Sequence, residues 1–391
     1  MMKTGKPEIA TSLLSVRQSR IRELADIAMS MDGVLRLYFG ESNQPTPQYI
    51  KDAAVRALHE GYTFYTENAG LPSLRHAIAA KYRDLHNVDL DWKNVVITAS
   101  GVQALNVSIR CVMDPGDEAI VLTPAWPNGG ASVGMCSAHA IEIPHVLLND
   151  RYEIDFEAVE SALSKHTRLI IYTSPSNPLG WVARDSDQDR LLKICREHGL
   201  WLLADEVYER LYYRGSVAPS ILRKCTPADA VIVVQSFSKS YCMTGWRLGW
   251  LVSRADLAQK ATQLNEFIVS HAPSMSQKAG ETALRDGERE IRTMVDRLRE
   301  NRDFVRDALQ QMPGVTVPQA EGAFYLFPRI EGMRDSFDFC RRLLLEKKVG
   351  IAPGVAFGAG GEGSVRICYA ADRSVLEPAM ERLQSFVRSS C

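Results

Sequence analysis

Seven short apolar runs between residues 95 and 253 alternate with helical stretches, and this alternation constrains the fold more than any other feature. The runs are VVIT (95–98), AIVLT (119–123), AIEI (140–143), RLIIYT (168–173), LWLLAD (200–205), AVIVVQ (230–235) and LGWLVS (248–253). Most are apolar throughout, which is typical of strands in a sheet with both faces covered. Helical segments such as DQDRLLKICREHG separate them. The pattern predicts an α/β fold with a mainly parallel central sheet covered by helices, and an active site at the carboxyl ends of the strands.

The segments on either side of this region have a different pattern. A long amphipathic helix is predicted over 287–312, where Pro313-Gly314 follows it. Beyond it, the short strands GAFYLF and SVRICYA flank the helical stretch DFCRRLLLEK. We therefore expect a large α/β domain over 46–285 and a smaller α+β domain over 286–391, with the N-terminal segment 1–45 packing against the smaller domain.

Charge, hydropathy and cysteine usage argue against several classes of function. The formal net charge is −1 and no basic block occurs, so neither nucleic acid nor a membrane surface is an expected partner. No apolar run approaches the ~18 residues of a spanning helix, and the N-terminus lacks a signal-peptide pattern, so we expect a cytoplasmic protein. The eight cysteines are scattered without metal-ligand spacing and no HExxH motif occurs, so no metal site is expected.

Polar residues follow four of the predicted strands at the point where each strand ends. Lys239, Asp205, Asn177 and the pair Ser100-Gly101 occupy these positions. Each has an ordinary structural explanation when taken alone: a surface lysine, a helix cap, a turn and a strand-to-helix connection. Together they place an amine, a carboxylate, an amide and an anion-binding helix start at one edge of the sheet. Pyridoxal phosphate is a cofactor that uses all four groups.

The order and spacing of the motifs resemble the class I/II aminotransferases of the fold-type-I pyridoxal-phosphate superfamily, the aspartate aminotransferase-like group. The motifs are YFGESNQPTP, YTFYTENAGLPSLRHAIA, TASGVQAL, DPGDEAIVLTPAWP, SPSNPLG, ADEVYERL, SFSKSYCMTGWRLGW and PGVAFGAGGEGSVRICYA, over roughly residues 35 to 370. The resemblance implies transamination of an L-α-amino acid with a 2-oxo acid by a ping-pong mechanism, through a Schiff base on Lys239. β-Elimination by a carbon–sulfur lyase on the same scaffold is the alternative, and a regulatory protein that senses pyridoxal phosphate is a remote one.

The resemblance also implies roles for individual residues. Lys239 is expected to bind the cofactor and move a proton, and Asp205 to keep the pyridine nitrogen protonated. Tyr208 and Asn177 are expected to bind the phenolic oxygen, while Trp126 stacks on the ring or packs in the core. The residues expected to bind the phosphate are Ser100, Gly101, Val102, Ser236, Ser238, Arg247 and, from the partner subunit of a homodimer, Tyr65.

Three residues are implied in substrate binding by the same resemblance: Gly40, Asn177 and Arg366. The guanidinium of Arg366 suits the α-carboxylate common to amino acid substrates. Val102 differs from the polar residue of other family members at its position, so only its backbone N–H is available. No residue in the sequence can be assigned to the substrate side chain, so acidic, aromatic and aliphatic donors all stay open.

Overall fold

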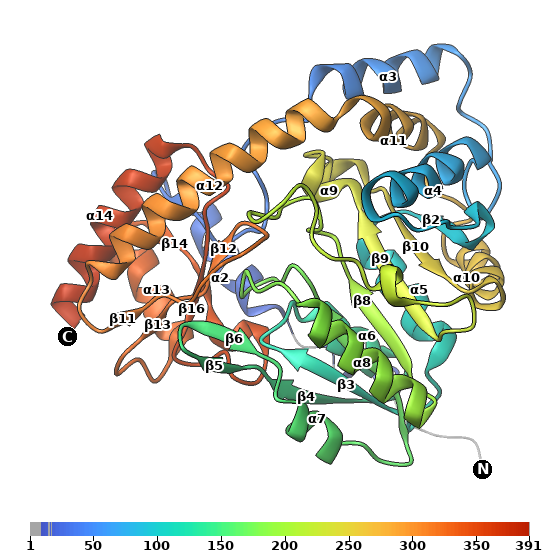
Figure 1. Cartoon of the computed structure of the whole chain (residues 1–391). Helices are drawn as coiled ribbons and strands as arrows, with labels where there is room; N and C mark the ends of the chain where they lie inside the picture. The colour runs from blue at the N-terminus through green and yellow to red at the C-terminus, as the bar shows by residue number, and fades with distance from the viewer. Residues whose placement is uncertain (1–8, 15, 17, 391) are drawn as a thin grey trace, which may run out of the picture.

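The computed structural model describes residues 9–14, 16 and 18–390, so Cys391 lies outside the described part of the chain. Its centre is a seven-stranded sheet in the order β2-β10-β9-β8-β7-β3-β4 (Figure 1). The strands are β2 (Val95–Thr98), β3 (Glu118–Thr123), β4 (His139–Pro144), β7 (Thr167–Thr173), β8 (Trp201–Asp205), β9 (Val231–Ser236) and β10 (Gly249–Ser253). Only β10 runs antiparallel to its neighbours. The predicted α/β fold with a mainly parallel sheet is confirmed.

Both faces of this sheet are buried, which explains why its strands are apolar throughout. Alternate residues of one strand enter two different clusters: Ile170 and Tyr172 face one cluster, whereas Leu169 and Ile171 face the other. The helices over the face of Ile170 are α4 (Pro72–His86), α8 (Asp185–His198) and α11 (Ser274–Asp286). The helices over the opposite face are α5 (Gly101–Val112), α6 (Asn128–Met135) and α10 (Ala255–Ile268).

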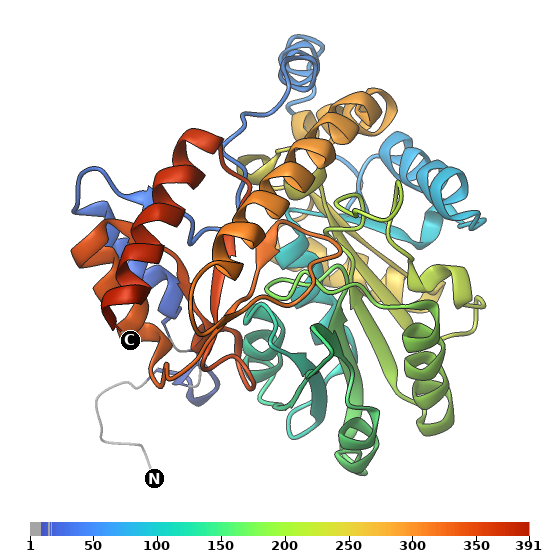
Figure 2. The ribbon, with the colours of Figure 1, turned by 60° about the vertical axis from the view of Figure 1, so that its left-hand side comes forward.

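A second group of elements lies beside the sheet and combines both ends of the chain. The helix α12 (Glu288–Gln310) runs from the sheet region into this group, where the N-terminal segment lies beside the C-terminal helices (Figures 1 and 2). Its helices are α2 (Arg20–Met29), α13 (Ser336–Lys347) and α14 (Arg373–Ser390). Its strands are β1 (Leu35–Arg36), β11 (Val315–Thr316), β12 (Tyr325–Leu326), β13 (Arg329–Ile330), β14 (Val349–Gly350), β15 (Ala352–Pro353) and β16 (Val365–Cys368). β1 pairs in parallel with β14.

The remaining elements are short or lie at the periphery. They are α1 (Thr11–Leu14), α3 (Gln48–His59), η1 (Trp92–Asn94), β5 (Val146–Leu148), β6 (Arg151–Glu153), α7 (Phe156–Ser161), η2 (Ile221–Lys224), α9 (Phe237–Ser240), η3 (Thr244–Trp246) and η4 (Gly354–Phe357). The strand predicted over GAFYLF shrinks to Tyr325–Leu326, because Ala323 has a left-handed φ of 56° that interrupts the extended backbone before it. Across the described residues, no helix combines the length and apolar character needed to span a bilayer.

A buried ion pair ties α4 to the segment that follows β8. The Lys81 ammonium and His86 Nε2 both bind the carboxylate of Glu209, and the His86 contact measures 3.1 Å. Burial alone would raise the pKa of Glu209, but the Lys81 ammonium and His86 lower it to about 2. The segment anchored in this way also carries Asp205 and Tyr208, so the ion pair fixes the chain next to the end of β8.

We expect Glu209→Gln to lower the free energy of unfolding by about 3–5 kcal/mol, because Lys81 is left buried without a counter-charge. The carboxylate stabilises the folded state above its ordinary pKa of 4.5, and this contribution is lost as the pH falls toward 2. The difference between wild type and variant in urea unfolding should therefore shrink over that range. Lys193→Met, which breaks the exposed Lys193–Glu197 pair, is the control and should cost at most about 1 kcal/mol. Equal effects of the two substitutions would contradict this account of the ion pair.

Candidate active site

A cavity of about 420 Å³ lies at the carboxyl ends of the parallel strands. Strands β7, β8 and β9 end at Thr173, Asp205 and Ser236, and all three residues line it. This is where an α/β sheet is expected to bind its ligand. The sequence-predicted residues that line the cavity are Gly40, Gly101, Val102, Trp126, Asn177, Asp205, Tyr208, Ser236, Ser238, Lys239, Arg247 and Arg366.

Lys239 is held in the cavity by the short helix α9, which starts directly after β9. Ser236 caps this helix by accepting a hydrogen bond of 3.1 Å from Ser238 N. The Lys239 ammonium donates to the backbone oxygen of Gly40 over 2.7 Å. Burial lowers the pKa of Lys239 to about 8, and the nearby charges of Arg366 and Arg247 act in the same direction. Part of the population therefore carries a free, nucleophilic amine near neutral pH.

Asp205 is a buried carboxylate that forms no ion pair with any residue that the structure describes. Burial raises its pKa to about 6, while a hydrogen bond from Val207 N and the charge of Lys239 oppose the rise. That hydrogen bond, 3.2 Å long, is the only one its carboxylate accepts within the described part of the chain. A buried carboxylate is costly unless it is paired, so this position fits a ligand that brings a cationic N–H group.

Arg366, on β16, has an unused donor inside the site. Its Nη1 donates to Asn177 Oδ1 over 2.9 Å and its Nη2 donates to the backbone oxygen of Tyr38. The guanidinium also lies against the ring of Tyr325, 4.5 Å from the ring centre. Nε is buried and has no partner among the described residues. Because the Asn177 oxygen is occupied, the amide nitrogen is the group that remains to donate to a ligand.

Small residues bring the start of α5 against the end of β9. Ser100 caps α5 with its side chain, which accepts from Gln103 N over 3.1 Å, and its φ of 127° is unusual for a residue other than glycine. A Cβ added to Gly101 would lie 3.1 Å from the Cβ of Ser236, so a larger residue would push the helix away. The first backbone N–H groups of α5 and the hydroxyls of Ser236 and Ser238 thus face the same cavity as Arg247. This combination suits a phosphate.

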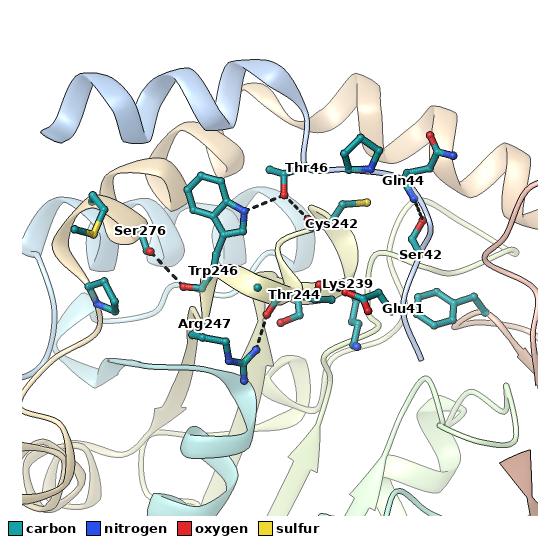
Figure 3. Close-up of a pocket in the computed structure, with 16 residues that line it drawn as sticks. Glu41, Ser42, Gln44, Thr46, Lys239, Cys242, Thr244, Trp246, Arg247 and Ser276 are labelled. Atoms are coloured by element: carbon teal, nitrogen blue, oxygen red, sulfur yellow. Dashed lines mark hydrogen bonds between the residues drawn. The ribbon is translucent and has the colours of Figure 1, made fainter. Parts of the chain in front are cut away.

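A second pocket of about 750 Å³ adjoins the cavity and shares Ser238, Lys239, Thr244 and Arg247 with it. Figure 3 shows Trp246 and Thr244 between Arg247 and the segment of Glu41 to Thr46. Trp246 Nε1 donates to Thr46 Oγ1 over 2.9 Å, and Arg247 Nη1 donates to the Thr244 backbone oxygen over 2.7 Å. These bonds hold the turn that presents Arg247.

Two predicted residues do not line the cavity. Ser100 lies behind it as the cap of α5. Tyr65 is 89% exposed and its ring contacts His271, with ring centres 5.6 Å apart. The contribution of Tyr65 to the site of a partner subunit stays a prediction.

The structure also brings residues into the site that the sequence analysis missed. Tyr325 Oη lies 2.8 Å from Tyr208 Oη, and a Cβ on Gly40 would overlap the Tyr325 hydroxyl. Tyr38 and Phe39 line the cavity directly before Gly40. Their position directly before the predicted Gly40 was an available signal for Tyr38 and Phe39, whereas Tyr325 lies next to no predicted site residue in the sequence. Arg22 of α2 also lines the cavity, and no motif pointed to it.

Comparison with known proteins identifies the class that this fold and site define. Residues 34–383 match the family model described as aminotransferase class I and II. The aspartate aminotransferase of Pyrococcus horikoshii is 35% identical over 98% of both chains, and the aromatic-amino-acid aminotransferase 2 of Thermococcus litoralis is 32% identical over 97% of this chain and 98% of its own. The crystal structure of aspartate aminotransferase from Thermotoga maritima superimposes with a TM-score of 0.91 at 31% identity, covering 97% of this chain and all of that one. The chain belongs to the class I and II aminotransferases, and it is an enzyme of that type.

The buried position of Lys239 leads to a prediction for the cofactor-free protein. Competitive labelling with acetic anhydride, read by mass spectrometry, should show the Lys239 amine half-reactive near pH 8, well below the ordinary lysine value of 10.5. The exposed Lys193 in the same sample gives the reference rate at each pH. A Lys239 midpoint close to 10.5 would show that burial does not free the amine.

Proposed function

We propose that this aminotransferase binds pyridoxal phosphate in the 420 Å³ cavity and transfers the amino group of an L-α-amino acid to a 2-oxo acid in a ping-pong reaction. The observation that carries the proposal is that two buried groups line one cavity. They are the amine of Lys239, whose pKa is lowered, and the carboxylate of Asp205, which has no ion-pair partner among the described residues. When bound, the cofactor supplies an aldehyde that condenses with amines and a pyridine ring that takes up electrons released at the substrate Cα.

The phosphate of the cofactor fits the positive end of the cavity. Arg247 offers a guanidinium, and the capped start of α5 offers backbone N–H groups at Gly101 and Val102. The hydroxyls of Ser236 and Ser238 complete the set, and Ser100 fixes the helix end that presents the N–H groups.

The ring of the cofactor fits the residues at the ends of β7 and β8. Asp205 would hold a proton on the pyridine nitrogen, and the resulting cation supplies the counter-charge that this carboxylate lacks. Tyr208 and the amide nitrogen of Asn177 would donate to the phenolic oxygen and favour its ionised form. Trp126 lines the same cavity and would stack on the ring.

Lys239 and Arg366 act on the substrate in this proposal. Lys239 would hold the cofactor through its Nζ, and as a free amine its Nζ would accept the proton released at the substrate Cα. Arg366 lines the cavity and would bind the substrate α-carboxylate with its guanidinium, and Gly40 leaves room for the hydroxyl of Tyr325. The hydroxyl of Tyr325, 2.8 Å from that of Tyr208, would hold the Tyr208 hydroxyl in place.

We further propose a homodimer with shared active sites. Phe64, Tyr65 and Phe267 are each at least 79% exposed, although they are large apolar or aromatic side chains. The two segments that carry them lie together, since Asn265 Nδ2 donates to Asn68 O over 3.2 Å. An exposed apolar patch of this kind fits a subunit interface, from which Tyr65 would reach the partner's phosphate.

The chain divides, in this proposal, into a large cofactor-binding domain over 46–285 and a smaller domain over 286–391 that also includes the segment 1–45. The parallel pairing of β1 with β14 supports the assignment of the N-terminal segment, because it joins that segment to the C-terminal part of the chain.

A half-reaction tests the proposed function most simply. Wild-type holoenzyme given an amino acid and no acceptor should convert one equivalent of bound cofactor to its amine form and then stop. Lys239→Ala should abolish this conversion and the absorbance of the cofactor bound to the wild type, because no other lysine of the described residues lines the cavity. Continued turnover with release of pyruvate or ammonia would instead identify a lyase, and normal transamination by Lys239→Ala would refute the role of Lys239.

The shared site predicts an effect of a distant residue on cofactor affinity. Tyr65→Phe should weaken pyridoxal phosphate binding by about 10- to 100-fold, since a hydrogen bond to a charged group contributes about 1.5–3 kcal/mol. Equilibrium dialysis measures the affinity, and sedimentation velocity reports the oligomeric state in the same sample. An active monomer, or unchanged affinity in the Tyr65→Phe dimer, would contradict the shared site.

A further inference from the structure

The turn that leads from β2 into α5 has a strained backbone. Ser100, in this turn, has a φ of 127° and a ψ of 162°, a conformation that residues other than glycine rarely adopt. Such a conformation persists only where the surrounding structure holds it. Gly101 and Val102 follow directly, and their N–H groups are the ones proposed to bind the phosphate. The contacts that hold Ser100 therefore decide where these N–H groups point.

Gln103, the third residue of α5, is bonded to this turn through both its backbone and its side chain. Its backbone N–H donates to Ser100 Oγ over 3.1 Å, and its Oε1 accepts from Ala99 N over 2.5 Å. Ala99 lies directly after Thr98, the last residue of β2. The amide of one glutamine thus binds the backbone before Ser100, while its own N–H binds the Ser100 side chain. The turn cannot relax without breaking both bonds.

Asn265 of α10 holds the other end of the Gln103 side chain. Gln103 Nε2 donates to Asn265 Oδ1 over 2.9 Å, and Asn265 is fully buried. Its Nδ2 donates in turn to the backbone oxygens of Asn68, over 3.2 Å, and of Ser270, over 3.4 Å. Flipping either amide would set two nitrogens or two oxygens against each other, so both orientations are fixed. The two amides form a directed chain of hydrogen bonds that starts at the N–H of Ala99.

We propose that Gln103 is a positioning residue for the phosphate group of the cofactor. Gln103 does not line the cavity, so it acts through the turn at Ser100, which it holds in the conformation that aims the N–H groups of Gly101 and Val102 at the phosphate. Because these donors are held in place before the ligand arrives, binding does not have to order them. This inference rests on the proposed function and assigns the residue that shapes its anion site.

Comparing two ligands separates this role from a general effect on folding. Pyridoxal lacks only the phosphate of pyridoxal phosphate, and equilibrium dialysis of the full-length, cofactor-free protein measures the affinity for each. Gln103→Met should weaken pyridoxal phosphate binding by about 10- to 100-fold, the loss expected for a hydrogen bond to a charged group. Pyridoxal binding should be unchanged, because pyridoxal makes no contact at the phosphate position. Gln103→Ala, which removes the same amide with less bulk, should behave in the same way.

Gln188 of α8 provides the matched control. It is also a buried helical glutamine, and its Nε2 donates to Pro219 O over 3.0 Å. Neither Gln188 nor Pro219 lines the cavity. Gln188→Met should therefore leave the affinities for both ligands unchanged.

Hydrogen–deuterium exchange gives a readout that needs no ligand. In the cofactor-free protein, Gln103→Met should speed exchange in peptides that contain Ala99 and Ser100, because the N–H of Ala99 loses its acceptor. Peptides from β8 should exchange at the wild-type rate.

Several outcomes would overturn the role of Gln103. They are an equal loss of affinity for both ligands in Gln103→Met, unchanged affinity for both, an equal effect of Gln188→Met, and unchanged exchange at the turn. In each case a wild type that binds pyridoxal phosphate more tightly than pyridoxal still supports the proposed cofactor site. A wild type that binds the two ligands equally would refute the phosphate site, and with it the proposed function.

Discussion

The burial of two ionisable groups at the ends of β8 and β9 is the constraint on which the rest of the structure depends. Asp205 and the nearby Lys239 are both removed from water. Burial raises the pKa of Asp205 and lowers the pKa of Lys239, so it favours the neutral form of each side chain. Buried ionisable groups without an ion pair are costly to the fold, and such groups with shifted pKa values cluster where a ligand or a reaction uses them. The sheet allows both groups to be buried, because side chains pack against both of its faces and keep water away from the ends of its strands.

The surrounding structure supports this arrangement by fixing the backbone on each side. The buried pair of Lys81 and Glu209 holds the segment that follows Asp205, and the side-chain caps of α5 and α9 fix the two helix starts at the position proposed for the phosphate. The N-terminal segment contributes Gly40 to the site, and the backbone oxygen of Gly40 accepts a hydrogen bond from the Lys239 ammonium. The site therefore depends on residues that are far apart in the sequence. The pairing of β1 with β14 positions the N-terminal segment that carries Gly40.

The positions of the sheet strands can be predicted from the sequence, because each apolar run and each turn is recognised from a few consecutive residues. All seven strands occur at the predicted positions, and the long helix differs from its prediction by one residue at its start and two at its end. Residues in motifs after strands are predicted to meet, since parallel strands end at one edge. The strand at Tyr325 is shorter than predicted, because Ala323 before it has a left-handed φ of 56°. Arg22 could not be predicted as a site residue, because its position depends on how α2 packs in three dimensions and no local pattern encodes that.

The central claim is that Lys239 is the amine at which this aminotransferase holds its cofactor. The most direct measurement is borohydride reduction of the protein loaded with pyridoxal phosphate, followed by proteolysis and mass spectrometry of the lysine-containing peptides. The account predicts one phosphopyridoxyl group per chain, attached to Lys239 in the peptide SFSKSYCMTGWR. Attachment to a different lysine, or no attachment at full cofactor occupancy, would contradict it.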